Sequence, residues 1–275
     1  MRFALIAIAA TLLVAGCQTP MVVTPAAPAQ PAAPQGPQIQ PAPQVQLQQE
    51  PVTQRQRADV HADLAAGYYE RGQMEVAIEE LGIAEKLDPT HARVHNLYGL
   101  VYATMGDLAR AEAQFKRALE LAPSDPDARH NWGWFLCTTG RARESIPEFD
   151  VAIRNPLYRT PEVALVNAGK CSAAAGDVAA ADQYLRRALQ LRPNDAGAAY
   201  NLALLSFKGG RVPESRALMK VVMQQNAPSP EALYLGMCVE RRLGDRQAEQ
   251  SYVTQLRNRY PESAEARAIG SGDCE

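Results

Sequence analysis

The chain has 275 residues, a formal net charge of −2 and an aromatic content of only 6%. This length suffices for one or two domains with a core, and the near-zero charge excludes a strongly basic nucleic-acid-binding protein. Abundant alanine and few aromatic residues favour tightly packed helices over a β-sandwich, and the 20 prolines are unevenly placed along the chain.

Residues 1–16 predict a lipoprotein signal peptide. Arg2 supplies a positive charge, and residues 3–14 form an apolar run that is too short to cross a bilayer but suits a signal-peptide core. The run ends in Val-Ala-Gly directly before Cys17, which resembles the bacterial lipobox, whose cysteine is lipidated and becomes the first mature residue. We therefore expect lipidation of Cys17; the alternative is an ordinary cleaved signal peptide followed by an incidental cysteine.

The residue after Cys17 predicts the destination of the lipoprotein. Residue 18 is Gln, not the Asp that resembles an inner-membrane retention signal. In a double-membrane bacterium this predicts a lipid-anchored protein of the outer membrane that faces the periplasm. Several acyl chains make such an anchor effectively permanent, because each buried CH₂ contributes about 0.8 kcal/mol.

Residues 17–57 predict a disordered tether that follows the lipid. Between residues 19 and 51 the chain is mainly Pro, Ala, Gln and Val, with almost no charge and no helical period. Such runs favour extended polyproline II and bury too little apolar surface to fold. Fully extended, at about 3.1 Å per residue, the tether would reach on the order of 100 Å.

Residues 58–269 repeat a pattern of about 34 residues, which is typical of the tetratricopeptide repeat (TPR). Glycines recur where the first helix of each pair ends, and prolines follow the second helix, which they cannot continue. The glycines are Gly72, Gly106, Gly140 and Gly176. We predict an all-α TPR superhelical solenoid of about six helix-turn-helix repeats, a short capping helix near residues 263–269 and a flexible tail at 270–275.

No catalytic arrangement is evident in the sequence. His91 and His95 are four residues apart, but the HExxH pattern of a zinc site is absent, as are the common phosphate-binding and nucleophile motifs. We therefore expect no enzyme activity, no cofactor, no metal and no small-molecule substrate.

Four cysteines besides Cys17 would lie in an oxidising compartment. Cys137 and Cys171 fall near the same position of neighbouring first helices, so we predict a disulfide between them. The alternative is two buried thiols that merely pack. Whether Cys238 pairs with Cys274 stays open.

The concave side of a TPR stack is lined by the first helix of each pair and is the expected binding surface. Trp134 stands out because Trp132 fills the core position two residues earlier, which directs Trp134 elsewhere. Alternatively, the two-residue insertion after this repeat buries Trp134 against a neighbouring repeat. Aromatic side chains on a groove are typical anchors for a bound peptide. The predicted groove residues are His130, Trp134, Val166, Lys170, Tyr200, Leu204 and Phe207.

Four stretches go beyond a generic TPR, namely residues 130–137 (HNWGWFLC), 155–161 (NPLYRTP), 167–171 (NAGKC) and 260–263 (YPES). Together with the lipobox, they resemble the type IV pilus biogenesis and stability lipoprotein family, called PilF or PilW. The resemblance covers about residues 58–269. It implies a pilotin, a TPR scaffold that the type IV pilus secretin needs in order to reach the outer membrane and assemble. The alternatives are a general outer-membrane TPR adaptor for β-barrel assembly or peptidase recruitment, and an enzyme of cell-wall turnover.

Overall fold

The computed structural model describes residues 52–270 and Cys274. All of the described residues belong to one compact unit, Pro51–Glu275. The predicted signal peptide, Cys17 and residues 17–51 of the predicted tether lie outside the described residues. Within the described part, thirteen helices and no strand are present. They are α1 (Gln54–Glu70), α2 (Met74–Leu87), α3 (Ala92–Thr104), α4 (Leu108–Leu121), α5 (Pro126–Thr138), α6 (Ala142–Arg154), α7 (Pro161–Ala174), α8 (Val178–Leu191), α9 (Ala196–Lys208), α10 (Val212–Val222), α11 (Pro230–Leu243), α12 (Arg246–Arg259) and α13 (Ala264–Ala268).

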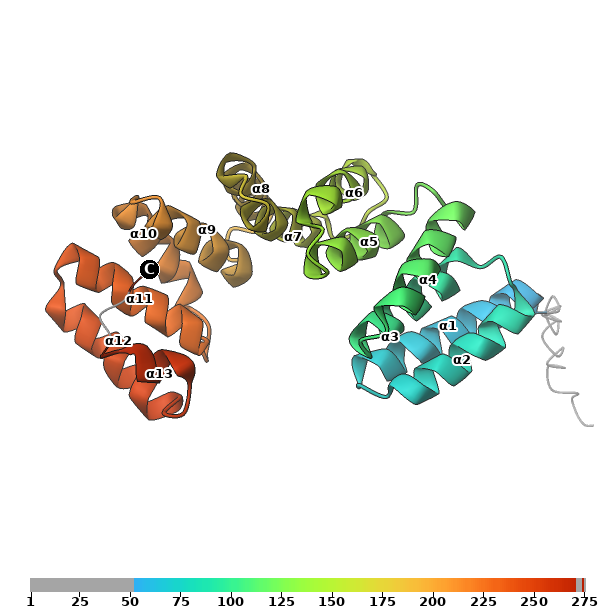
Figure 1. Ribbon diagram of the computed structural model, residues 1–275, viewed down its shortest axis with the longest axis horizontal. Helices are drawn as coiled ribbons and strands as arrows, with labels where there is room; N and C mark the ends of the chain where they lie inside the picture. Colours follow the sequence, from blue (N-terminus) through green and yellow to red (C-terminus); the bar gives the residue numbers. More distant parts are fainter. Residues whose placement is uncertain (1–51, 271–273, 275) are drawn as a thin grey trace, which may run out of the picture. The chain divides into compact units, whose positions relative to one another are not determined.

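The helices pack as six consecutive pairs, α1–α2 to α11–α12, followed by α13 (Figure 1). A glycine with positive φ lies in the turn of every pair, where an L side chain would be strained. These glycines are Gly72, Gly106, Gly140, Gly176, Gly210 and Gly244, with φ between 75° and 85°. The predicted all-α TPR fold, with its short final helix, is therefore confirmed.

The first helix of each pair also contacts the first helix of the next pair, from α1 and α3 through to α9 and α11. Among the described helices, no second helix contacts the following second helix in this way. The first helices of successive pairs therefore approach one another more closely than the second helices do, and they form the inner side of the stack (Figure 1).

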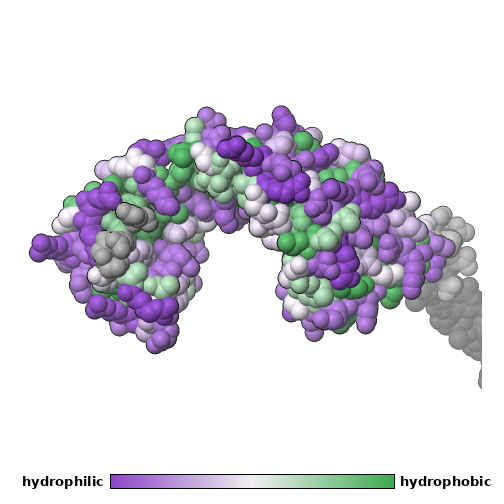
Figure 2. Space-filling model, in the orientation of Figure 1, coloured by the Kyte–Doolittle hydropathy of each residue, from purple (hydrophilic) through white to green (hydrophobic). Residues whose placement is uncertain are grey.

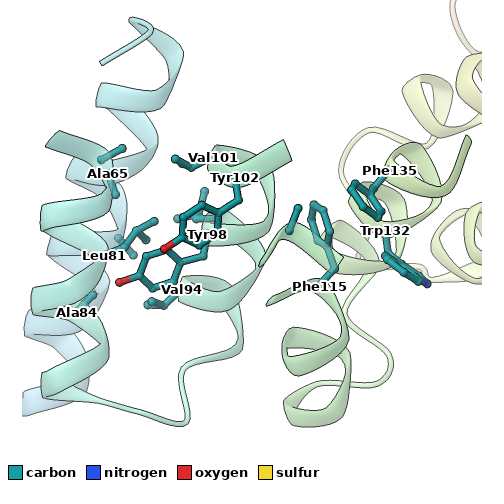
Figure 3. Packing of buried hydrophobic residues seen from close by; sticks show 14 of the residues in the cluster. Ala65, Leu81, Ala84, Val94, Tyr98, Val101, Tyr102, Phe115, Trp132 and Phe135 are labelled. Carbon is teal, nitrogen blue, oxygen red and sulfur yellow. The ribbon is translucent and has the colours of Figure 1, made fainter. Parts of the chain in front are cut away.

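In four of the six pairs, a glycine of the first helix lies against a large side chain of the second helix. A Cβ added at Gly99 would lie 2.6 Å from the ring of Phe115, and one at Gly169 would lie 2.6 Å from Cγ of Leu185. Only glycine permits this approach between two helices. Figure 3 shows the aromatic side chains of this core, where the Phe115 ring centroid lies 6.1 Å from that of Trp132.

The folded part begins earlier than the sequence predicts. Helix α1 starts at Gln54, whereas the predicted boundary placed residues 54–57 in the tether. The side chain of Thr53 accepts a hydrogen bond from the backbone N–H of Gln56, and the Gln56 side chain accepts one from Thr53 N–H. This capping box stabilises the start of the helix. Residues 54–57 are all polar, so no apolar period indicates a helix at these positions. None of the helices in the described part is long and apolar enough to span a membrane.

Candidate functional site

Two adjoining cavities lie between the first helices of the last three repeats. The larger cavity, of about 440 Å³, lies between α7 and α9, and two residues of α8 also line it. On the face shown in Figure 2, hydrophobic residues are visible in the region of α7 to α9. The lining residues are Gly169, Lys170, Ala173, Val178, Leu185, Asn201, Leu204, Leu205, Lys208 and Gly209.

The second cavity, of about 220 Å³, lies between α9 and α11. Leu204 lines both cavities, so they adjoin along α9. The lining residues are Tyr200, Leu204, Phe207, Glu231, Tyr234, Leu235, Cys238, Glu265 and Cys274. Four of the seven predicted groove residues, Lys170, Tyr200, Leu204 and Phe207, therefore line this pair of cavities, which we call the α7–α11 groove.

Tyr200 is one of the two half-buried aromatic residues that line the groove; the other is Tyr234. Burial raises the pKa of the Tyr200 hydroxyl, and the carboxylates of Glu231 and Glu265 raise it further. The hydroxyl therefore stays protonated and available as a hydrogen-bond donor at neutral pH. A tyrosine of this kind combines a large apolar face with one polar tip, as protein-binding surfaces often require.

Phe207 was predicted on the open groove, but its side chain is only 5% exposed. It packs in the core cluster with Val212 and Met237, and the guanidinium of Arg242 lies 5.2 Å from its ring centroid. The following repeat covers the ring, because Leu235 and Cys238 of α11 face it across the smaller cavity. Phe207 is thus part of the groove wall.

His130 does not line the α7–α11 groove. Its Nδ1 is hydrogen-bonded to the hydroxyl of Tyr158, and its Nε2 lies 3.1 Å from Nδ2 of Asn167. The ring also packs edge-on against Phe149, with 5.7 Å between the centroids. Burial lowers the pKa of His130 to about 4. Both ring nitrogens are occupied within the fold, so the prediction of a groove role for His130 is corrected to a packing role.

Trp134 and Val166 also lie outside the two cavities. Trp134 is half-buried and packs against two core clusters, one that contains Trp132 and one that contains Cys171. Its side chain therefore fills the junction between neighbouring repeats, which matches the alternative interpretation more closely than an open anchor. Val166 packs against the cluster of Leu165, Ala188 and Ala198.

Two disulfides connect helices of the described part. Cys137 of α5 is joined to Cys171 of α7, with 5.8 Å between their Cα atoms. Cys238 of α11 is joined to Cys274, with 5.5 Å between the Cα atoms. The second disulfide forms one wall of the smaller cavity. Cys274 is therefore fixed to α11, and the prediction of a flexible tail is wrong at this residue because the disulfide holds it.

A third cavity, of about 230 Å³, lies between α3 and α5 and was not predicted. It is bordered by Asn96 and Asn131, whose amides are hydrogen-bonded at 3.1 Å, and by Asp125 and Asp127. Burial raises the pKa of Asp127, and the neighbouring Asp125 contributes to the same shift. The only sequence signal for this cavity is an Asn that recurs in successive first helices, at Asn131, Asn167 and Asn201, and such an Asn is common in TPR helices.

The groove offers apolar contact area and a few polar side chains. Among the described residues, no group of three or more His, Cys, Asp or Glu side chains is placed to hold a metal ion. The arrangement is suited to binding a protein segment in the space between the first helices.

Comparison with known proteins agrees with this architecture. Residues 63–126 and 172–235 match the tetratricopeptide repeat family. The type IV pilus assembly protein PilF of Pseudomonas aeruginosa is 27% identical over 207 residues, which cover 75% of this chain and 82% of PilF.

Two solved structures extend the similarity to the whole folded part. The crystal structure of PilW, a widely conserved type IV pilus biogenesis factor, is 28% identical with a TM-score of 0.72, covering 77% of this chain and 97% of PilW. The P. aeruginosa PilF structure is 25% identical with a TM-score of 0.74, covering 80% of this chain and 99% of PilF. The chain is therefore a tetratricopeptide repeat protein that is similar, over most of its folded part, to the type IV pilus proteins PilF and PilW.

Proposed function

We propose that this protein is a lipid-anchored scaffold of the outer membrane that acts as a pilotin for the type IV pilus secretin. In this role the periplasm-facing TPR domain binds secretin subunits and promotes their delivery to the outer membrane and their assembly there. The similarity to P. aeruginosa PilF, which covers most of both chains, supports a role in pilus assembly.

The observation that carries the proposal is the α7–α11 groove. Two adjoining cavities, with Leu204 shared between them and Tyr200 at one side, provide a recess between helices for apolar side chains of a bound segment. Recesses of this kind anchor peptide segments, and a few buried apolar or aromatic side chains supply most of the binding energy.

The membrane anchor is part of the proposal. Lipidation at Cys17 and a long Pro-rich tether would keep the TPR domain at the membrane while it reaches subunits in the periplasm. Cys17→Ala should leave the protein soluble in the periplasm or uncleaved in the inner membrane. Recovery of the wild-type protein in the inner membrane would contradict the proposed outer-membrane location.

A deletion strain tests the pilotin role. Secretin monomers should still be made at normal levels, because synthesis does not depend on the scaffold, but detergent-resistant secretin multimers and surface pili should be lost. Expression of the deleted gene in trans should restore both the secretin multimers and the pili. Normal secretin multimers in the deletion strain would overturn the pilotin role and favour a general outer-membrane TPR adaptor.

A further inference from the structure

The cavity between α7 and α9 lies where α7 carries Ala173, a small residue at a position that a phenylalanine occupies in α9. When the repeats are aligned by their turn glycines, Lys170 corresponds to Trp134 of α5, and Ala173 corresponds to Phe207 of α9. Trp134 packs into the junction of its own repeat, and Phe207 is buried in the next. The cavity at the α7–α9 junction has a volume of about 440 Å³, which is within the range of ligand pockets.

The charged side chains that line this cavity are both lysines. Lys170 and Lys208 are exposed, and neither has a hydrogen-bond or ion-pair partner among the described residues. Lys208 lies in the last turn of α9, where a cation interacts with the helix dipole. Lys170 lies in the interior of α7 and has no such role. No acidic residue lines the cavity, so an anionic ligand would meet two uncompensated ammonium groups.

Asn201 adds a further polar group to the lining of the cavity. Its Nδ2 donates to the carbonyl of Gly197 at 2.7 Å, which leaves Oδ1 to accept a hydrogen bond. A backbone N–H of an extended peptide is a suitable donor. Leu204 and Leu205 provide the apolar part of the same cavity, and Val178 of α8, whose side chain is 51% exposed, lies at its edge.

We propose that the α7–α9 cavity binds an extended partner segment in which an apolar side chain is flanked by carboxylates. The apolar side chain enters the space beside Ala173, and the carboxylates meet Lys170 and Lys208. The inference rests on the proposed function only for the identity of the partner, a secretin segment of this chemistry. An anionic lipid is less well matched, because Asn201 and the enclosed apolar wall suit a peptide backbone and a single side chain.

A peptide panel tests the proposal on the full chain in non-ionic detergent. One labelled peptide carries a central Leu-Phe pair flanked by Glu and is blocked at both ends; matched peptides replace Glu by Gln or by Lys. Fluorescence anisotropy should show the Glu peptide binding at least tenfold more tightly than the Lys peptide. Raising the salt concentration should reduce this difference. A further Gln peptide with a free C-terminal carboxylate shows whether a chain end supplies the anion.

Two variants locate the binding. Lys170→Glu/Lys208→Glu should weaken Glu-peptide binding at least tenfold while leaving the Gln peptide nearly unaffected. Lys86→Glu/Lys220→Glu, which reverses two exposed lysines of second helices, is the matched control and should bind like the wild type. Ala173→Phe should weaken binding of both peptides, because the added ring fills the cavity from an exposed position without disturbing the core.

Equal binding of the Glu and Lys peptides, or wild-type binding by the lysine variant, would overturn the proposal. Lysine-dependent binding of phosphatidylglycerol vesicles without peptide binding would also overturn it in favour of a lipid site. This assay contains no secretin, so it tests the peptide site separately from the pilotin role. If the peptides fail to bind as expected but the deletion strain loses its secretin multimers, only the inference about the α7–α9 cavity is overturned. If the Glu peptide binds more tightly than the Lys peptide but the deletion strain keeps normal secretin multimers, only the proposed pilotin function is overturned.

Discussion

The hydroxyl of Tyr158 is hydrogen-bonded to Nδ1 of His130, which joins the α6–α7 loop to α5. With the ring proton on Nδ1, that N–H donates to Tyr158, and Nε2 accepts from the amide of Asn167 on α7. One imidazole therefore connects the third repeat, the inserted loop and the fourth repeat.

Replacing Tyr158 by Phe should destabilise this junction. The largely buried Nδ1–H of His130 would lose its partner, at a cost of about 1–2 kcal/mol. Urea unfolding followed by far-UV circular dichroism measures the change. Tyr200→Phe is the matched control, because the Tyr200 hydroxyl has no hydrogen-bond partner among the described residues. Equal stability of the two variants would show that the hydrogen bond contributes nothing.

His130 should also make stability depend on pH. Its pKa is lowered to about 4 by burial, so between pH 6.5 and 4 the unfolded chain binds a proton that the folded chain does not. This contribution is fully present above pH 6.5 and is lost as the pH falls, by up to about 3 kcal/mol near pH 4. Unfolding measured across this range should show a smaller slope for His130→Gln than for the wild type. An unchanged slope would contradict the shifted pKa.

The glycines between paired helices should tolerate no side chain. Gly169→Ala would place a Cβ 2.6 Å from Cγ of Leu185 and should destabilise the protein by about 1–3 kcal/mol. Gly67→Ala in α1 is the control, because no atom lies within 4 Å of its added Cβ. This control should stabilise the helix by about 0.5–1 kcal/mol. Thermal unfolding compares the two, and equal melting temperatures would contradict close packing at Gly169.

Both disulfides should be present in protein taken directly from the periplasm. Intact mass under non-reducing, denaturing conditions should show all four thiols blocked, and peptide mapping should pair Cys137 with Cys171 and Cys238 with Cys274. Each bridge should stabilise the fold by about 4 kcal/mol in the chain-entropy model. Alkylation of any of the four cysteines before reduction would contradict the corresponding bridge.

The repeat architecture could be predicted because it depends on local rules. A positive φ requires glycine in each turn, and a glycine every 34 residues or so therefore marks the helix pairs, as Gly72 and Gly106 do. A short capping helix near residues 263–269 was expected because a repeat stack needs its last apolar face covered. The start at Gln54 was missed, because its signal is a side-chain cap, not an apolar period.

The groove could be predicted only in part, because it depends on which side chains meet between helices. Tyr200 and Leu204, which were chosen by their helix positions, line the cavities of the groove. It failed for His130, whose partner Tyr158 comes from the inserted loop, and for Phe207, which the next repeat covers. The cavity beside Ala173 could not be predicted, because its volume depends on the sizes and positions of all the side chains around it.

The measurement that tests the central claim most directly is the yield of detergent-resistant secretin multimers in strains that carry groove variants. Tyr200→Ala/Leu204→Ala removes the aromatic residue and the leucine shared by both cavities, and a lost anchor costs roughly 2–4 kcal/mol at an interface. Multimers should fall severalfold. Because both side chains also pack against the core, far-UV circular dichroism at the growth temperature must show that the variant is folded. Leu191→Ala, a change on the exposed side of α8, should leave the multimer yield unchanged. A normal multimer yield in the folded groove variant would contradict the claim that this groove serves secretin assembly.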